Sequence, residues 1–390
     1  MNSRIGRWCS PALHLLLVTL AGAGCRADRA DSEAPSVAFV VYDAGETLAL
    51  LPVADRLRGR GIEVRWIPLT PWAADLLGAN QEAFLDLPEL IGEMPHVAAR
   101  DAETDVAFWE EALARNPPEL AVSGLVSTAQ AQLGMWFQTV GIESRGFHDG
   151  FQPPGPESIS ARTASAFDGL WVPTVRVKDG FDALGIPAVL AGQPTLEAWR
   201  RTSGEVDVPE IRSRIGTREG DRILLFAGQY GLGYEEVLAS FLEELGPVLS
   251  ADSSLVLVVS HHPRTGGEIE MGALEEAGLP RATMAPEGLP TMELAVAADV
   301  ILTWTSTVGV QAAFMGKPVV YYSPPADFDA HLIDQGAAFM ADGGTLAPVL
   351  GTVLGSEHSP ETIRRILTDS GYVVDADSVV AELIMEGVGG

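Results

Sequence analysis

Cysteine is nearly absent: the 390 residues contain two, Cys9 and Cys25. Both lie close to the N-terminus, so the remainder of the chain can form no internal disulfide and can offer no cysteine ligand to a metal. The zinc spacing His-Glu-x-x-His and the serine-hydrolase turn Gly-x-Ser-x-Gly are missing as well. We therefore predict no metal site and no cofactor.

A Walker-type Gly-Lys-Ser phosphate loop is also missing. The nearest sequence, Gly316-Lys317-Pro318, follows a predicted helix and precedes a predicted strand. We expect it to form an ordinary turn from which Lys317 points to solvent.

Positive charge is scarce, with 25 Lys and Arg against 53 Asp and Glu and a net charge of −28. A surface this acidic repels phosphate backbones and anionic lipid head groups, so the composition disfavours nucleic-acid binding and a polybasic membrane patch. Two explanations of the charge remain: solubility or a saline habitat, which we favour, and attraction of a cationic partner.

The N-terminal apolar run, Leu15 to Leu20, is too short to span a bilayer as a stable helix. It follows Arg4 and Arg7 and precedes the small residues 21–24. A positive start, a short apolar core and small residues are the parts of an export signal. We predict a signal peptide over residues 1–24 and a polar tether over residues 25–35.

The small residues before Cys25 resemble a bacterial lipoprotein processing box. The resemblance implies acylation of the Cys25 thiol and a membrane-anchored protein of the cell envelope, facing the periplasm or the exterior. Gly22 stands where the box usually has an aliphatic residue. Two alternatives stay open: a cleaved, secreted protein, and an uncleaved anchor or misread start, including an anchor on the cytoplasmic face.

Strand and helix patterns begin at Ser36. The run Val37 to Tyr42 is continuously apolar, Leu48 to Arg58 is amphipathic, and Glu63 to Pro68 is a second strand, which together form a βαβ unit. Continuously apolar strands are typical of a parallel sheet covered on both faces. Further strands are predicted at 120–122, 141–147, 169–172 and 188–191, with helices near 81–92, 104–115 and 127–140.

A second alternation of strands and helices starts at Arg222, after a charged helical connection over residues 196–220 that we interpret as a hinge. Its strands are predicted at 222–227, 255–259, 282–284, 300–303 and 318–322, and its helices at 234–245, 291–297, 308–315, 360–369 and 376–386. The sequence thus predicts two α/β domains, 36–200 and 201–390, each a Rossmann-like doubly wound parallel sheet, facing a central cleft. The last helix is free to pack back on the first domain.

The most specific motif lies within residues 298–322. There a buried strand delivers Thr305, Ser306 and Thr307 to the start of a helix, where backbone N–H groups and hydroxyls favour an anion. Simple capping of that helix by Ser306 or Thr307 is the alternative explanation. A glycine-rich loop, Gly228 to Gly233, could also approach a phosphate, although glycines make tight turns for other reasons.

The run S-T-V-G-V-Q-A-A-x-x-G-K-P-V-V, which starts at Ser306, resembles the nucleotide-binding half of GT-B-type glycosyltransferases and the related UDP-N-acetylglucosamine 2-epimerases. His262-Pro263-Arg264 is similar to the His-Pro element of GT-B transferases that use cytidine nucleotide donors. The resemblance implies that His262 and Arg264 meet the donor phosphates and that Ser306 and Thr307 hold the diphosphate. Gln311 falls near a position where the family usually has a glutamate that binds the ribose hydroxyls.

Candidate catalytic residues lie at strand ends in the first half. The resemblance implies a catalytic base near Glu46, at the lip of the cleft, and the alternative is that Glu46 complements the helix dipole. His148 and Asp149 end another strand, yet adjacent side chains point different ways, so a base oriented by its neighbour does not follow.

We therefore expect a GT-B-like transferase or epimerase that acts on a nucleotide-activated sugar of the cytidine or uridine diphosphate type, with a glycan acceptor, in envelope polysaccharide metabolism. A donor made in the cytoplasm conflicts with an outward-facing anchor. The alternative is a non-catalytic surface lipoprotein that binds a phosphorylated or glycan ligand in the same cleft, and a periplasmic binding protein fits the motif at Ser306 less well. The sequence does not indicate an oligomeric state.

Overall fold

The computed structural model describes residues 34–85, 111–113, 116–262, 265–326, 328–356 and 359–389. Pro35–Gly390 forms one compact unit. The predictions for the signal peptide, most of the tether and Cys25 lie outside the described residues, and so do Arg264 and the sequence from 86 to 110.

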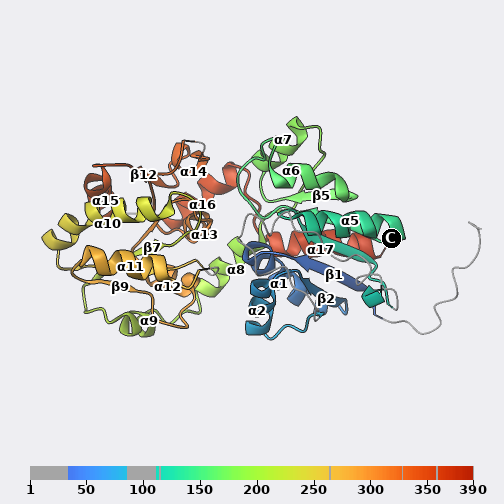
Figure 1. Cartoon of the computed structure of the whole chain (residues 1–390), viewed down its shortest axis with the longest axis horizontal. Helices are drawn as coiled ribbons and strands as arrows, with labels where there is room; N and C mark the ends of the chain where they lie inside the picture. Colours follow the sequence, from blue (N-terminus) through green and yellow to red (C-terminus); the bar gives the residue numbers. More distant parts are fainter. Residues whose placement is uncertain are drawn as a thin grey trace, which may run out of the picture. The chain divides into compact units, whose positions relative to one another are not determined.

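The first half contains a six-stranded sheet in the order β2-β1-β3-β4-β5-β6, and every neighbouring pair is parallel (Figure 1). The strands are β1 (Ser36–Val41), β2 (Glu63–Pro68), β3 (Leu120–Gly124), β4 (Glu143–Phe147), β5 (Gly169–Val172) and β6 (Val189–Leu190). The helices are α1 (Ala44–Arg58), α2 (Pro71–Ala79), α5 (Thr128–Val140), α6 (Ile159–Thr163) and α7 (Val175–Ala183).

The second half repeats the design with a parallel sheet in the order β12-β11-β10-β7-β8-β9. The strands are β7 (Arg222–Ala227), β8 (Leu255–Ser260), β9 (Ala282–Met284), β10 (Val300–Thr303), β11 (Val319–Tyr322) and β12 (Phe339–Ala341). The helices from the connection onward are α8 (Pro194–Ser203), α9 (Val208–Ile215), α10 (Tyr234–Ala251), α11 (Glu268–Ala277), α12 (Thr291–Ala297), α13 (Val308–Phe314), α14 (His331–Asp334), α15 (Leu346–Gly355), α16 (Pro360–Asp369) and α17 (Ala376–Val388).

Both faces of each sheet are covered, and β1 shows how its sequence allows this. Val37, Phe39 and Val41 join the core shared with α1 and α17, whereas Ala38 and Val40 join the core shared with α5. Alternate residues of a strand point to opposite faces, so a strand buried on both sides must be apolar throughout. The predicted fold class, two doubly wound parallel sheets, is confirmed.

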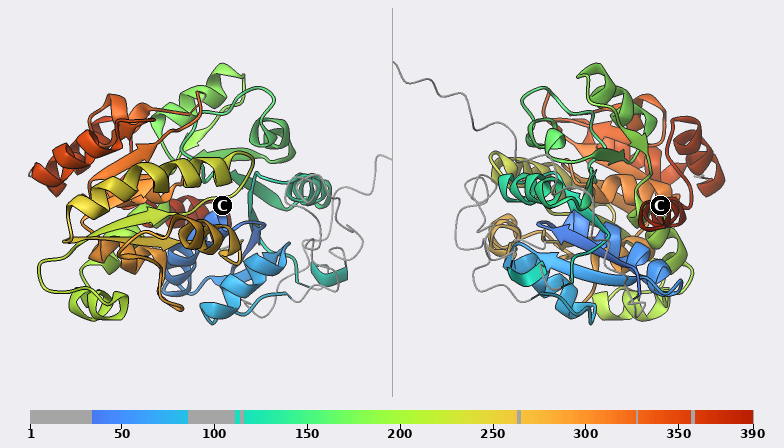
Figure 2. Two further views of the ribbon diagram at one scale, coloured as in Figure 1. Left: turned by 60° about the vertical axis from the view of Figure 1, so that its left-hand side comes forward. Right: turned by 90° about the vertical axis from the view of Figure 1, so that its right-hand side faces the viewer.

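The C-terminal helix α17 packs in the first half, although it follows the second in sequence (Figures 1 and 2). Val380, Ala381 and Ile384 are buried against the first sheet and α1. Asp377, fully buried, pairs with Arg56 of α1 at 2.9 Å and with Arg201 of α8 at 2.6 Å. The chain therefore crosses between the halves twice, and one carboxylate ties three of the helices together.

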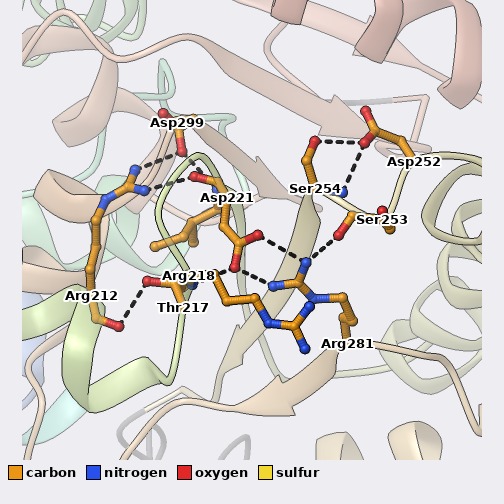
Figure 3. Close-up of polar contacts among 10 residues, drawn as sticks. Arg212, Thr217, Arg218, Asp221, Asp252, Ser253, Ser254, Arg281 and Asp299 are labelled. Atoms are coloured by element: carbon orange, nitrogen blue, oxygen red, sulfur yellow. Dashed lines mark hydrogen bonds and ion pairs between the residues drawn. The ribbon is translucent and has the colours of Figure 1, made fainter.

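A polar network holds the amino edge of the second sheet (Figure 3). Asp221, before β7, accepts hydrogen bonds from Arg281, which precedes β9. Asp299, before β10, accepts from Arg212 of α9 at 2.8 Å and from the N–H of Ile223 at 2.7 Å. These contacts bind neighbouring strand starts to one another, so this edge serves stability and leaves the carboxyl edge for ligands.

Several sequence-based expectations need correction. Residues 81–85 are not helical: Gln81 has a φ of 59° and Phe84 bridges to Trp66, because α2, which the sequence did not reveal, already ends at Ala79. Lys317 does not point to solvent. Its ammonium donates to the carbonyls of Val296 (2.6 Å) and Ala298 (2.9 Å) and so caps the end of α12.

Candidate functional site

The carboxyl edge of the first sheet collects ionisable and amide side chains. Asp43 and Glu46 follow β1, Gln130 follows β3, and His148 with Asp149 follows β4. Parallel strands all end at the same edge, so loops distant in sequence meet there.

Glu46 is fully buried, so the expectation that it lies at the lip of a cleft is wrong for its side chain. Its Oε2 accepts from the N–H of Tyr42 at 2.9 Å and from the amide of Gln130 at 2.8 Å, while Oε1 has no hydrogen-bond partner among the described residues. Burial raises the pKa of Glu46 well above its usual value, and the nearby Asp149 carboxylate raises it further. Glu46 is therefore a neutral carboxylic acid well above pH 4.5.

Two glycines make room for this acidic pair. A Cβ on Gly124 would stand 1.7 Å from Glu46 Oε1, and a Cβ on Gly45 would stand 2.1 Å from Asp149 Oδ2. Both distances are impossible for real atoms, so the absence of side chains at these positions admits the two carboxyl groups. Asp149 is half-buried, in contrast to Glu46, and its carbonyl oxygen accepts from the amide of Gln193 at 2.9 Å.

His148 lies apart from the acidic pair. Its ring meets Phe181 edge to face, with centroids 5.3 Å apart, and neither ring nitrogen has a close hydrogen-bond partner among the described residues. Burial lowers the pKa of His148 to about 4, and a weak interaction with the backbone of Gln152 opposes the shift. The imidazole is therefore neutral and a weak base at pH 7.

The carboxyl edge of the second sheet carries hydroxyl and amide groups instead. Thr305 Oγ1 accepts from the side-chain amide of Gln229, in the loop after β7, at 3.2 Å. Ser306 is buried, and its Oγ accepts from the N–H of Val308 at 3.3 Å, whereas Thr307 is exposed. Ser306 thus accepts from the first N–H of α13, whereas Thr307, at the N-cap position, makes no side-chain cap. A capping hydroxyl uses its oxygen as acceptor and keeps its O–H as a donor.

His262 lies beside the same loop, with its ring 4.4 Å from that of Tyr230 in an edge-to-face contact. Gln311 is buried, and its amide donates to Thr195 of α8 at 3.3 Å. Gly228 is enclosed: a Cβ there would stand 2.4 Å from the carbonyl oxygen of Ser260. The structure therefore gathers His262, Gly228 and the Thr305 segment, and turns Gln311 toward the connecting helix.

Neither a metal-binding cluster nor a membrane-spanning helix occurs among the described residues. No group of three or more His, Cys, Asp or Glu residues there is arranged to hold a metal ion. No helix among these residues has the length and apolarity to cross a bilayer.

Two six-stranded parallel sheets with helices on both faces define the GT-B fold, the class that includes UDP-N-acetylglucosamine 2-epimerases and many glycosyltransferases. Residues 219–330 match the family described as capsule polysaccharide biosynthesis protein. This match contains the loops after β7, β8 and β10 that form the second edge. No curated protein is similar enough in sequence to count as a relative.

Solved structures give the fold in more detail. The UDP-GlcNAc 2-epimerase from Neisseria meningitidis, bound to UDP-GlcNAc, superposes with a TM-score of 0.69 at 13% identity, over 90% of this chain and 100% of that one. A glycosyltransferase from Rickettsia africae has a TM-score of 0.62 at 11% identity, over 92% and 98% of the two chains. MurG from Acinetobacter baumannii has a TM-score of 0.57 at 15% identity, over 91% and 100%. These likenesses establish the fold.

Sequence reasoning missed residues that organise both edges. Gln130 had a signal, because Ser127-x-x-Gln130 is a capping box: Ser127 accepts from the N–H of Gln130, and the Gln130 side chain accepts from Val126. Glu270 had none. It lies in the acidic first turn of α11 and is nonetheless fully buried, with Oε1 accepting from the hydroxyl of Tyr234 at 2.8 Å.

Proposed function

We propose that this protein is a GT-B-type enzyme that acts on a nucleotide-activated sugar in envelope polysaccharide metabolism. The observation that carries the proposal is the position of the capsule-biosynthesis match, residues 219–330, over every loop of the second carboxyl edge that holds a candidate donor-binding residue. The epimerase of the same fold was crystallised with UDP-GlcNAc bound, which supports a uridine or cytidine diphosphate sugar as the ligand here.

In the proposed complex the second edge binds the donor phosphates. Ser306 and Thr305 offer hydroxyl protons, Thr307 is exposed at the start of α13, and His262 lies beside the adjoining loop. Neutral donors suit the diphosphate of an incoming sugar nucleotide because they stabilise its charge without a metal ion. Arg264, outside the described residues, stays a proposed contact on the strength of the resemblance alone.

The first edge would supply the proton transfer. We assign the base to Asp149, which is half-buried, rather than to Glu46, which is fully buried and neutral, or His148, whose low pKa makes it weak. The acceptor hydroxyl would lose its proton to Asp149 as its oxygen bonds to the anomeric carbon. The bond from that carbon to the phosphate oxygen would break, and the nucleoside diphosphate would leave into the second edge.

Turnover of nucleotide sugars tests the proposal. The full chain is incubated with UDP-GlcNAc and with a CDP-activated sugar, and the released nucleotide and any epimerised sugar are measured. We expect turnover of one donor, with a loss of at least about 100-fold in Asp149→Asn, the scale of general base catalysis. Turnover equal in wild type and Asp149→Asn contradicts the assigned base, and absence of turnover with both donors contradicts the proposed activity.

Burial favours a second function, ligand binding without catalysis. Glu46 has no exposed surface, and both ring nitrogens of His148 are enclosed, so two of the three candidate catalytic groups are shielded from a substrate. A chain that binds UDP or CDP tightly and turns over neither donor would be this non-catalytic protein.

The envelope location and the lipid at Cys25 remain part of the proposal. A nucleotide sugar made in the cytoplasm reaches the enzyme only if the domain faces inward, or if a donor is present outside. Protease treatment of intact cells reports the side on which the domain lies, and loss of a metabolically incorporated fatty acid in Cys25→Ser reports the anchor.

A further inference from the structure

Glu270 is a buried carboxylate that none of the proposed catalytic steps uses. It lies in the first turn of α11 with no exposed surface. A carboxylate buried in this way needs hydrogen-bond donors, since an unpaired charge in the interior is costly. Its position therefore calls for a function within the surrounding loops.

The contacts of Glu270 lead to the glycine-rich loop. Oε1 accepts from the Tyr234 hydroxyl at 2.8 Å, and a Cβ on Gly228 would stand 2.6 Å from the same oxygen. The backbone of Gln229 also interacts with the Tyr234 hydroxyl and opposes the rise of its pKa. Glu270 thus contacts both ends of the loop of residues 228–233. It packs against Gly228, the first residue of the loop, and it accepts a hydrogen bond from Tyr234, the first residue of α10.

The same chain of contacts reaches the proposed donor site. The Gln229 side chain donates to Thr305 Oγ1 at 3.2 Å, and the Tyr234 ring stacks on Trp304, with centroids 6.2 Å apart and planes at 23°. Loops after β7, β8 and β10 are therefore joined through Tyr234. Burial and the Glu270 carboxylate raise the pKa of Tyr234, which keeps its hydroxyl protonated as a donor.

We infer that Glu270 is a positioning residue, which through Tyr234 fixes the loop of residues 228–233 against the Thr305 segment. The inference rests on the proposed function only for the nature of the ligand beside that loop. The Glu270 side chain fills the space behind Gly228. The phosphates would lie at Thr305 to Thr307, and the loop would face an uncharged part of the sugar nucleotide.

Hydrogen exchange of the loop amides tests the positioning without any ligand. In the full chain, Tyr234→Phe keeps the stacked ring and removes the hydroxyl, and we expect exchange within residues 228–233 to accelerate about tenfold, the effect of one buried hydrogen bond. Glu270→Ala should match it, the double variant should exceed neither single one, and Glu270→Gln, which retains an acceptor oxygen, should show a smaller change.

Tyr322→Phe is the matched control. Its hydroxyl donates to Glu244, also at 2.8 Å, from the end of β11 and away from the loop. Loop exchange that is unchanged in Tyr234→Phe, or equally accelerated in Tyr322→Phe, overturns the inference. A folding defect in Glu270→Ala does not decide the matter, because Tyr234→Phe and Glu270→Gln make the same test.

Calorimetry with UDP and CDP separates this inference from the proposed function. If the wild type binds either nucleotide, Tyr234→Phe should weaken binding about tenfold and Tyr322→Phe should not. Equal binding by Tyr234→Phe would remove the loop from the donor site. If the wild type binds neither nucleotide, the proposed function fails, and loop exchange alone decides whether Glu270 positions the loop.

Discussion

The two carboxyl edges differ in chemistry although the sheets share one topology. The first edge holds the carboxyl groups of Asp43, Glu46 and Asp149 and the imidazole of His148, of which Glu46 and the ring nitrogens of His148 are buried. The second holds hydroxyl and amide donors around Thr305 and Ser306. A repeated scaffold thus carries carboxyl and imidazole groups at one edge and hydroxyl and amide groups at the other, and the proposed function assigns proton transfer to the first and phosphate binding to the second.

The largest expected effect tests how tightly the first edge is built. Gly124→Ala would force a Cβ onto the Glu46 carboxyl group, and we expect a loss of about 3 kcal/mol in the free energy of unfolding, measured by denaturant titration. Gly272→Ala, within α11 and with nothing near its Cβ, is the control and should stabilise by about 0.5 kcal/mol. A loss below about 0.5 kcal/mol in Gly124→Ala would mean that Glu46 is not packed there.

The next largest expected loss of stability comes from breaking an ion pair, and we expect it to differ between the two halves. Asp377→Asn would leave Arg56 and Arg201 without their shared carboxylate, and we expect a loss of about 2 kcal/mol, reduced from the usual cost of a broken buried pair because both arginines are partly exposed. Asp299, the partner of Arg212, is more exposed than Asp377, so Asp299→Asn should lower the free energy of unfolding by only about 1 kcal/mol. A larger loss in Asp299→Asn than in Asp377→Asn would contradict the role of Asp377 in joining three helices.

The pH dependence of the Asp377 pair has a definite sign. Burial opposes ionisation, but the ion pairs with Arg56 and Arg201 prevail and lower the pKa of Asp377 below its usual value. Its contribution is therefore present above about pH 4 and is lost as the pH falls through the folded pKa. The difference between the wild type and Asp377→Asn should shrink in acid, and a difference that grows in acid would be the wrong sign.

Glu46 should show the opposite sign. Because burial raises its pKa in the folded state, unfolding releases a proton between the ordinary and the raised pKa, and the wild type should lose about 1.4 kcal/mol for each pH unit in that window. Glu46→Gln removes this slope. Thermal or denaturant unfolding at several pH values above 4.5 measures it, and parallel curves for the two proteins would show that Glu46 is ionised in the fold.

The fold could be predicted from sequence because its signals are local. The strands β1, β7 and β10 are apolar except for one polar residue at an end of each, and the alternation with amphipathic helices identifies parallel sheets. Elements without such signals were missed: β12 has three residues, only one of them buried, and α2 has no polar face to mark its period. The sequence of α2 is mostly apolar, and its only start signals are the cap Thr70 and Pro71 at the first helical position.

The candidate site was predictable only in part, since side-chain environments depend on partners remote in sequence. The Ser306 segment could be found because its strand, hydroxyls and helix are contiguous. The burial of Glu46 depends on Gly124, its hydrogen bond comes from Gln130, and the burial of Lys317 depends on the end of α12. Glu270 shows the limit most clearly, because an acidic residue in the first turn of a helix gives no sign of burial.

The most direct test of whether the nucleotide binds at the second edge and not at the first is the nucleotide affinity of one variant at each edge. Calorimetry of the full chain with UDP and CDP should show binding that falls about tenfold or more in Ser306→Ala and is unchanged in Asp149→Asn. Ser127→Ala, which removes a capping serine of the first half, controls for the loss of a cap and should bind like the wild type. Binding that survives Ser306→Ala but fails in Asp149→Asn would contradict the account, because the phosphates would then lie at the first edge.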